Sequence, residues 1–358
     1  AGPSLNEEAL EAIKRWQDQA VIFSCGRALQ VLCKAGIEPD IHIEVERDKN
    51  TVEHLQLQIK NCGRLQMDSL LLLPTRMHPQ IMDLSSQPLI YCKAQDAGGS
   101  LLPIDYPRVE HANPNVANGG AAMAAYLGFS DIIFFGVDLG YYTPEKHHAE
   151  GSIYYENGGR FERSHQFGDM EMAAVGGGSI TSEQIFHWSR MRLERLIMQS
   201  PHGKFVNASQ GAHIHGTEVI KPQDLQIGNA PTQKSVVLAA LKANFESWAS
   251  PEEIVAETIR NLEQGMDEIV EYLDQHFSKP AANRGDIMDR VLGLDDLLQT
   301  SRLADSAASW LFGGSLAHYT MILCTHASYT GDERKAVDFA NTALRIIRTF
   351  ARNARAMT

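Results

Sequence analysis

The chain has 358 residues, of which 44% are hydrophobic and 21% are charged, and its formal net charge at pH 7 is −12. No apolar run approaches the roughly 18 residues of a membrane-spanning helix, and Lys and Arg nowhere form the dense clusters that bind a phosphate backbone. These features argue against a membrane or nucleic-acid partner, and they predict one large domain or two moderate domains.

The cysteines and the first residues bear on the cellular location. The five cysteines have neither the density of a disulfide framework nor a CxxC metal spacing, so we expect a reducing cytoplasm. They are Cys25, Cys33, Cys62, Cys92 and Cys324. The sequence opens with Ala1-Gly2-Pro3-Ser4-Leu5, without an initiator Met or a signal-peptide pattern. We therefore expect that it begins inside a longer polypeptide.

The first part of the chain shows repeated strand–helix units. Residues 21–24 form a strand candidate that leads through a glycine turn into a helix ending near Gly36. Further strand candidates cover residues 39–46, 69–73 and 89–91. Strands that alternate with helices predict a mostly parallel sheet.

The most informative segment covers residues 113–142. Turn-forming motifs at 113–115 and 118–120 precede small and apolar residues that predict a close-packed helix ending near Gly128. Residues 132–135 are apolar at every position, which is typical of a parallel strand covered on both faces. Ligands bind outside the carboxyl ends of such strands. The residues expected at this edge are Asn118, Gly136, Asp138, Gly140, Tyr141 and Tyr142.

The composition changes near residue 230, after which glycine becomes sparse and helix-forming residues dominate. Ser250 and Pro251 are suited to begin an amphipathic helix. We therefore predict an α/β domain over residues 1–230 and a helical domain over 231–358. The helical domain is interpreted as a scaffold for acceptor docking or oligomerisation, with His318, Cys324 and His326 as packing residues.

Four places gather residues that are capable of chemistry. A glycine-containing turn at residues 2–5 exposes backbone N–H groups to a phosphate, although alone it is an ordinary turn. Ser24-Cys25-Gly26 allows close backbone approach to a ligand and equally fits a simple strand–helix turn, with Asp40 and Glu44 nearby.

The other two places are longer polar segments. Residues 138–151 combine an acid, two phenols, a cation and two imidazoles, and this density favours function. The two histidines are adjacent rather than spaced as a helical zinc pair, so we predict no structural zinc. Residues 207–217 either face a ligand or form a turn satisfied by their own Asn207 and Ser209 side chains.

These segments together resemble the motility accessory factor family of bacterial flagellin glycosyltransferases, whose catalytic domain is similar to that of bacterial sialyltransferases. The resemblance covers roughly residues 1–220, and the order of its motifs is specific. The motifs are GPSL at 2–5, residues 28–40 with Glu44, NGG at 118–120, FGVDL at 135–139, HAEG at 148–151, and residues 207–217.

The resemblance implies a Rossmann-like, sialyltransferase-type sheet flanked by helices and followed by an all-α domain. It implies transfer of a nine-carbon sugar, pseudaminic or legionaminic acid, from its CMP-activated form to Ser or Thr of flagellin, for flagellum assembly and motility. The CMP-sugar is a substrate, and no cofactor is implied. Because the sugar-binding region contains no Asp-X-Asp pair, we expect no obligatory metal. A homo-oligomer is compatible with the sequence.

Each predicted donor contact follows from the chemistry of a CMP-sugar. Its single phosphate suits the turn at residues 2–5 and the one at 24–26, without the Walker lysine that this chain lacks. Amide and carboxylate side chains would form hydrogen bonds with the ribose and sugar hydroxyls. The predicted donor-binding residues are Gly2, Pro3, Ser4, Ser24, Gly26, Glu44, Asn115, Asn118, Gly119, Gly136, Asn207 and Ser209.

The predicted catalytic residues are His148, Asp138, Tyr141 and Tyr142. Sialyltransferases of this type use a histidine after the strand-Gly-X-Asp segment, but the comparable place here, residues 179–182, has none. His148 is the leading candidate for the base, and His165, His187 and His213 are alternatives. Tyr141, Tyr142, Lys146 or His148 would stabilise the departing CMP.

Two other functions remain open. The same domain type resembles an archaeal pterin-diphosphate-forming kinase, which would use ATP and magnesium. The long helical C-terminal part argues against this kinase, and so does the absence of an obvious cluster of carboxylates for magnesium, although Asp40, Glu44 and Asp138 could converge in space. A non-catalytic flagellin chaperone is the third reading, because the expected histidine is missing.

Overall fold

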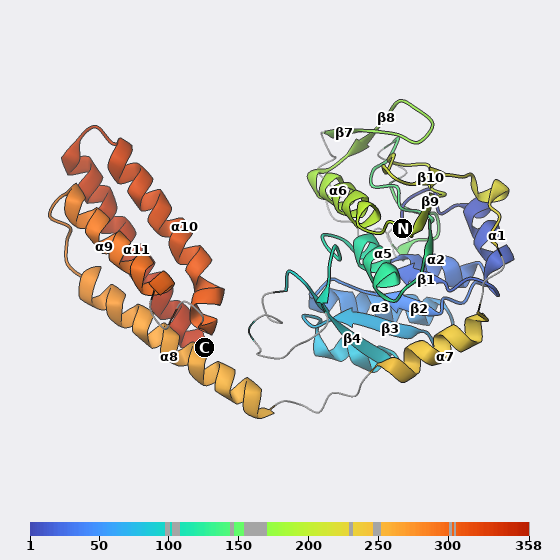
Figure 1. Cartoon of the computed structure of the whole chain (residues 1–358), viewed down its shortest axis with the longest axis horizontal. Helices are drawn as coiled ribbons and strands as arrows, with labels where there is room; N and C mark the ends of the chain where they lie inside the picture. Colours follow the sequence, from blue (N-terminus) through green and yellow to red (C-terminus); the bar gives the residue numbers. More distant parts are fainter. Residues whose placement is uncertain are drawn as a thin grey trace. The chain divides into compact units, whose positions relative to one another are not determined.

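The structure is a computed structural model. It describes residues 1–96, 101, 108–143, 147–153, 170–228, 232–245, 252–300, 303 and 306–357. Two compact units are present, one formed by residues 1–96 and 106–247 and the other mainly by residues 248–358. The first unit contains the sheets, and the second is helical (Figure 1).

Parallel strands form the framework of the first unit, as the sequence predicts. One sheet has the order β1 (Phe23–Cys25), β2 (Ile41–Ile43), β3 (Leu70–Pro74), β4 (Pro88–Lys93) and β5 (Arg108–Val109). The other has the order β10 (Glu218–Val219), β9 (Lys204–Asn207) and β6 (Asp131–Phe134). All these neighbours pair in parallel, whereas β7 (Met170–Ala173) and β8 (Ser179–Ser182) form an antiparallel pair. The carboxyl ends of the parallel strands therefore define an edge suited to ligand binding.

Helices cover both faces of the five-stranded sheet. The helices of this unit are α1 (Glu7–Trp16), α2 (Ala28–Lys34), α3 (Lys49–Asn61), α5 (Val116–Tyr126), α6 (Gln184–Met198) and α7 (Lys234–Asn244), with short 3₁₀ helices η1 (Pro79–Leu84) and η4 (Pro222–Asp224). Leu71 and Leu73 pack with α2 and α3, whereas Leu70 and Leu72 belong to the core around α5. This division follows from the alternation of side chains along a strand.

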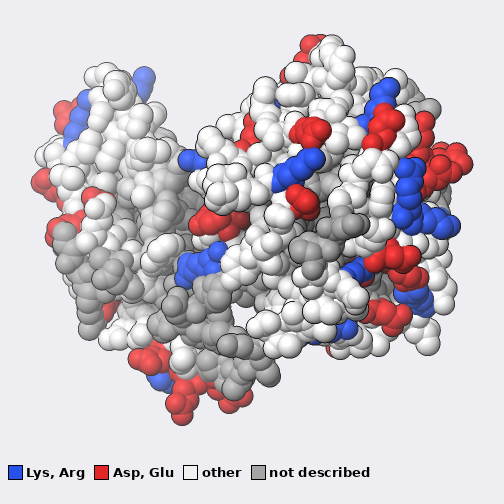
Figure 2. Space-filling model, turned by 45° about the vertical axis from the view of Figure 1, so that its right-hand side comes forward, with Lys and Arg blue, Asp and Glu red and all other residues white. Residues whose placement is uncertain are grey.

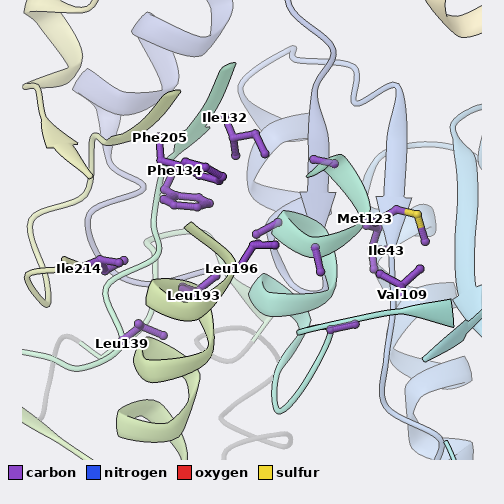
Figure 3. Packing of buried hydrophobic residues seen from close by; sticks show 14 of the residues in the cluster. Ile43, Val109, Met123, Ile132, Phe134, Leu139, Leu193, Leu196, Phe205 and Ile214 are labelled. Atoms are coloured by element: carbon purple, nitrogen blue, oxygen red, sulfur yellow. The ribbon is translucent and has the colours of Figure 1, made fainter. Parts of the chain in front are cut away.

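Helix α5 lies at the centre of the largest core. Figure 3 shows Met123 of α5 beside Ile43 and Val109, with Leu193 and Leu196 of α6 directed into the same core. Close packing requires small residues, because a Cβ atom on Gly120 would lie 2.5 Å from Cys25 Sγ. The predicted close-packed helix is therefore confirmed, and it ends at Tyr126, two residues before the predicted Gly128, with Leu127 as its C-cap.

The second unit consists of long helices. They are α8 (Glu252–His276), α9 (Arg284–Thr300), α10 (Ala307–Tyr329) and α11 (Glu333–Met357). Their apolar faces share one core, in which Ile269, Leu316 and Leu344 are almost completely buried. The predicted helical C-terminal part is confirmed, while Ser250 and Pro251 lie outside the described residues.

The boundary between the units lies later than the predicted residue 230. Helix α7 belongs to the first unit, because its Leu241 and the following Phe245 pack against the α5 core. Lys234 Nζ also lies 2.7 Å from Asp40 Oδ2. The change in composition therefore marks the start of α7 rather than the end of the first unit, which extends to Ser247.

The surface charges and the state of the cysteines are those that the composition predicts. Figure 2 shows Lys and Arg side chains interspersed with Asp and Glu on the face in view. All five cysteines are free thiols. No helix in the described part of the chain is long and apolar enough to cross a bilayer.

Candidate functional site

Asp138 is the centre of the candidate site. It follows β6 and is only 3% exposed, and its Oδ2 accepts a hydrogen bond of 2.9 Å from the Ser4 backbone N–H. The Gly2 N–H donates to the Gly136 carbonyl at 2.9 Å. A Cβ atom on Gly2 would lie 2.1 Å from Asp138 Oδ2, so only glycine fits there. The structure therefore brings the predicted Gly2, Ser4, Gly136 and Asp138 together.

Burial changes the acidity of Asp138. It raises the pKa of the carboxyl above its ordinary value of 3.8, and hydrogen bonds from Ser4 oppose that rise without cancelling it. A carboxyl group whose pKa is raised toward neutral pH is suited to taking up or releasing a proton. The site thus holds a carboxyl group suited to proton transfer, a role predicted from the sequence for a histidine.

A third loop, which follows β9, closes on the same residue. The Ala212 N–H donates to the Asp138 carbonyl at 2.7 Å. A Cβ atom on Gly211 would lie 2.2 Å from that carbonyl oxygen, and sequence reasoning did not single out this glycine. Asn207 Oδ1 accepts the Ser209 N–H at 3.0 Å, and Ser209 Oγ accepts the Val137 N–H at 2.9 Å. Both side chains therefore hold the loops together, which matches the second of the two readings of this segment.

The predicted tyrosines and His148 lie around these loops. Tyr141 is buried, while Tyr142 is exposed and donates its hydroxyl to the Gln210 carbonyl at 2.9 Å. The ring of His148 lies 4.4 Å from that of His147. The Ala149 N–H donates to the Ala1 carbonyl at 3.2 Å, so this histidine segment contacts the start of the turn at residues 2–5.

The alternative bases occupy different places. His187 lies on α6, and His213 follows Gly211, with its ring 4.9 Å from that of His215. Lys146 and His165 lie outside the described residues.

Ser24, Gly26 and Glu44 lie at the carboxyl edge of β1 and β2. Gly26 has a φ of +53°, which favours glycine, and its N–H donates to the Ile43 carbonyl at 3.0 Å. The Ser24 hydroxyl lies 2.7 Å from His42 Nδ1, and His42 Nε2 lies 3.4 Å from Glu44 Oε1. The Ser24 side chain is thus engaged inside the core, which leaves Gly26 and Glu44 as the groups nearest the edge.

Ala1 lies where the two parts of the site meet. Its nitrogen atom is within electrostatic reach of Cys25 and Glu44 at the first sheet and of Asp138 at the second. The predicted residues at both sheets therefore converge on one region.

Asn115 and Asn118 have clear structural roles. Asn115 caps α5, and the two residues form a reciprocal capping box. Asn118 is fully buried, donates to the Ser189 carbonyl at 2.9 Å and accepts the Ser189 hydroxyl at 2.6 Å. Donor contact by the Asn118 side chain would require these bonds to break. Gly119 is packed tightly, since a Cβ atom there would lie 3.4 Å from the Tyr91 hydroxyl.

The suggested magnesium site is wrong. Asp40 precedes β2 and Glu44 follows it, so the strand separates the two carboxylates. Asp40 instead accepts the Ile22 N–H at 2.7 Å and pairs with Lys234. Among the residues that the structure describes, no three His, Cys, Asp or Glu side chains form a group able to hold a metal ion.

Sequence reasoning missed two residues at the end of β4. Lys93 is 3% exposed, and burial lowers the pKa of its ammonium to about 8. The Tyr91 hydroxyl is buried without a hydrogen-bond partner, and burial raises the pKa of this phenol. The carboxyl-end rule that identified Asp138 would have found Lys93 if it had been applied to the predicted strand at 89–91.

A parallel α/β unit whose strand-end loops converge on a buried acid belongs to the Rossmann-like class, here joined to a helical unit. Residues 1–144 match a family model described as 6-hydroxymethylpterin diphosphokinase MptE-like. The whole chain is similar to the structure of the MAf glycosyltransferase from Magnetospirillum magneticum AMB-1, with a TM-score of 0.76 and 25% sequence identity.

That similarity covers 99% of this chain and 52% of the other, so the chain spans about half the length of that protein. No curated protein sequence matches the chain. The predicted resemblance to the motility accessory factor family is confirmed, and so is the predicted fold class.

Proposed function

We propose that the chain forms the catalytic part of a cytoplasmic glycosyltransferase that moves pseudaminic or legionaminic acid from its CMP-activated form to Ser or Thr of flagellin. Three segments meet at Asp138, namely the turn at residues 2–5 and the loops after β6 and β9, and this convergence carries the proposal. The likeness to a MAf glycosyltransferase along 99% of the chain supports it. The transfer uses no cofactor or obligatory metal, so EDTA should leave the rate unchanged.

In this reaction the acceptor oxygen bonds to the anomeric carbon, while the bond from that carbon to the CMP phosphate oxygen breaks. The acceptor proton passes to a base, for which His148 is the first candidate and Asp138, with its raised pKa, the second. The Tyr142 hydroxyl, which donates to the Gln210 carbonyl, would have to break that bond in order to donate to the departing phosphate. Because the Ser4 N–H is already bonded to Asp138, other groups must bind the phosphate.

The decisive experiment measures the intact mass of flagellin after incubation with each CMP-nonulosonic acid. Asp138→Asn should reduce transfer by about a hundredfold or more, because the substitution removes the proton-carrying carboxyl and keeps its shape. Asp131→Asn is the matched control, since Asp131 is an exposed acid at the start of β6. Equal transfer by wild type and Asp138→Asn would contradict the assignment.

The base is tested separately. His148→Ala should reduce transfer by about a hundredfold if His148 takes the acceptor proton. Unchanged turnover would leave Asp138, His165, His187 or His213 as the base.

Residues 1–144 match the pterin diphosphokinase family model, and this match supports an alternative function as a pterin diphosphokinase. Diphosphate formation from ATP, magnesium and a hydroxymethylpterin, without any sugar transfer, would favour that kinase. Tight flagellin binding, with CMP release no faster than spontaneous hydrolysis, would instead favour a non-catalytic assembly factor.

A further inference from the structure

Lys93 is a buried cation whose hydrogen-bond partner is a neutral side chain. It is the last residue of β4, and its ammonium donates one hydrogen bond, of 3.1 Å, to Asn113 Oδ1. Asp96 is engaged elsewhere, by Thr75 Oγ1 at 2.7 Å and by Arg76 Nε at 3.3 Å. Within the described ranges, no carboxylate forms an ion pair with Lys93. An ammonium has three N–H groups, so two of them remain for another partner.

Tyr91 supplies a second unsatisfied group on the same face of the sheet. It precedes Lys93 by two residues, and side chains two apart on a strand point to the same side. Its hydroxyl is buried and has no hydrogen-bond partner. That hydroxyl lies 3.4 Å from the position a Cβ atom on Gly119 would take, in the first turn of α5. Asn113, the partner of Lys93, lies just before the same helix.

The physical chemistry of these groups favours an anion. Burying an ammonium with one neutral partner costs free energy unless a negative group approaches it. The unpaired buried hydroxyl adds a further cost. The N-terminal turn of a helix carries partial positive charge, although the N–H groups of residues 117–119 are already bonded to Asn115. The Arg76 guanidinium adds positive charge to the surroundings of Lys93, and the negative charges of Glu46 and Asp96 oppose its effect without restoring the ordinary pKa of Lys93.

We propose that Lys93 and the Tyr91 hydroxyl, beside the first turn of α5, bind one anionic group, a phosphate or a carboxylate, of the substrate. The identity of the molecule carrying that anion rests on the proposed function, because a CMP-nonulosonic acid has one group of each kind. The anion site itself does not depend on that donor. A lysine that only held Asn113 in place would not respond to anions.

The test uses thermal unfolding of the full chain at constant ionic strength, with inorganic phosphate in one series and acetate in another. Phosphate or acetate should raise the melting temperature of the wild type and identify the anion. In Lys93→Met the apparent Kd for that anion should rise at least about tenfold, because a charge-assisted hydrogen bond is lost. Tyr91→Phe should weaken binding several-fold without lowering the melting temperature of the anion-free protein.

Lys204→Met is the matched control, because the Lys204 side chain is 58% exposed and pairs only with the exposed Glu218 among the described residues. It should respond to anions like the wild type. If wild type and Lys93→Met respond equally, or if neither anion affects the wild type, the proposal is overturned.

If Lys93→Met does not fold, NMR titration of Lys93 in the wild type provides the second measurement. The bound anion should raise the Lys93 pKa above the value in the free protein, and an unchanged value at saturating phosphate and acetate would overturn the site. CMP binding separates the two proposals. Failure of the wild type to bind CMP, with the Lys93-dependent anion response intact, would reject the proposed donor and leave the anion site standing.

Discussion

At the scale of single residues, Asp138 links stability to pH. Its folded pKa lies above the unfolded value near 3.8, so the folded chain retains this proton where the unfolded chain has released it. The contribution of Asp138 to stability therefore falls as the pH rises above about 3.8. Relative to wild type, Asp138→Asn should gain stability from pH 4 to pH 7. Urea unfolding at several pH values measures this difference, and a difference independent of pH would contradict the raised pKa.

Lys93 should show the opposite trend. Its folded pKa of about 8 lies below the ordinary lysine value of 10.5, so the unfolded chain binds more protons between these values. Stability therefore rises with pH through that window. In Lys93→Met this rise should be smaller, by an amount on the order of 1–3 kcal/mol. The same unfolding series at pH 7 to 10.5, without added anion, measures it, and an identical rise in both proteins would show that Lys93 is not buried as a cation.

Sequence reasoning identified residues at the strand ends better than it identified their roles. The position of Asp138 followed from the carboxyl-end rule, and the turn at residues 2–5 followed from a glycine-containing turn before a helix. The hydrogen bonds of the Ser24 and Asn118 side chains did not follow, because each is bonded to a residue that only the fold brings near. Hydrogen-bond partners distant in sequence leave no local pattern.

At the scale of elements, the loops after β6 and β9 are locked together by their backbones. Gly211→Ala would place a Cβ atom 2.2 Å from the Asp138 carbonyl oxygen, so one loop must move. We expect a loss of about 2 kcal/mol or more in the free energy of unfolding, together with loss of transfer. Gly228→Ala is the control, because no atom lies within 4 Å of its added Cβ. Equal melting temperatures for the two variants would contradict this contact.

The strands and helices of the first unit were largely predictable from apolar runs and turn residues. The antiparallel pair β7 and β8 was not predicted, because its alternating burial leaves few apolar residues in sequence. Helix α7 was predicted as helical but assigned to the wrong unit. Composition indicates the secondary structure of a segment, but it does not indicate which hydrophobic core the segment packs against.

At the scale of the whole molecule, the two units have separate cores. We expect two calorimetric transitions, and Leu344→Ala should lower only the transition of the helical unit by removing buried volume from its core. The corresponding change Leu193→Ala should lower only the other transition. A single transition shifted by both substitutions would show that the units unfold together.

The bond between Ser4 and Asp138 joins residues that are 134 positions apart. Closing so long a loop slows folding, whereas helices that pack mainly on their neighbours along the chain form quickly. The helical unit follows the first unit along the chain, yet we expect it to reach its native state faster during refolding. The candidate site, which depends on the most distant contacts, should be among the last features to form, so the regain of ligand binding should lag behind the regain of helix signal after refolding begins.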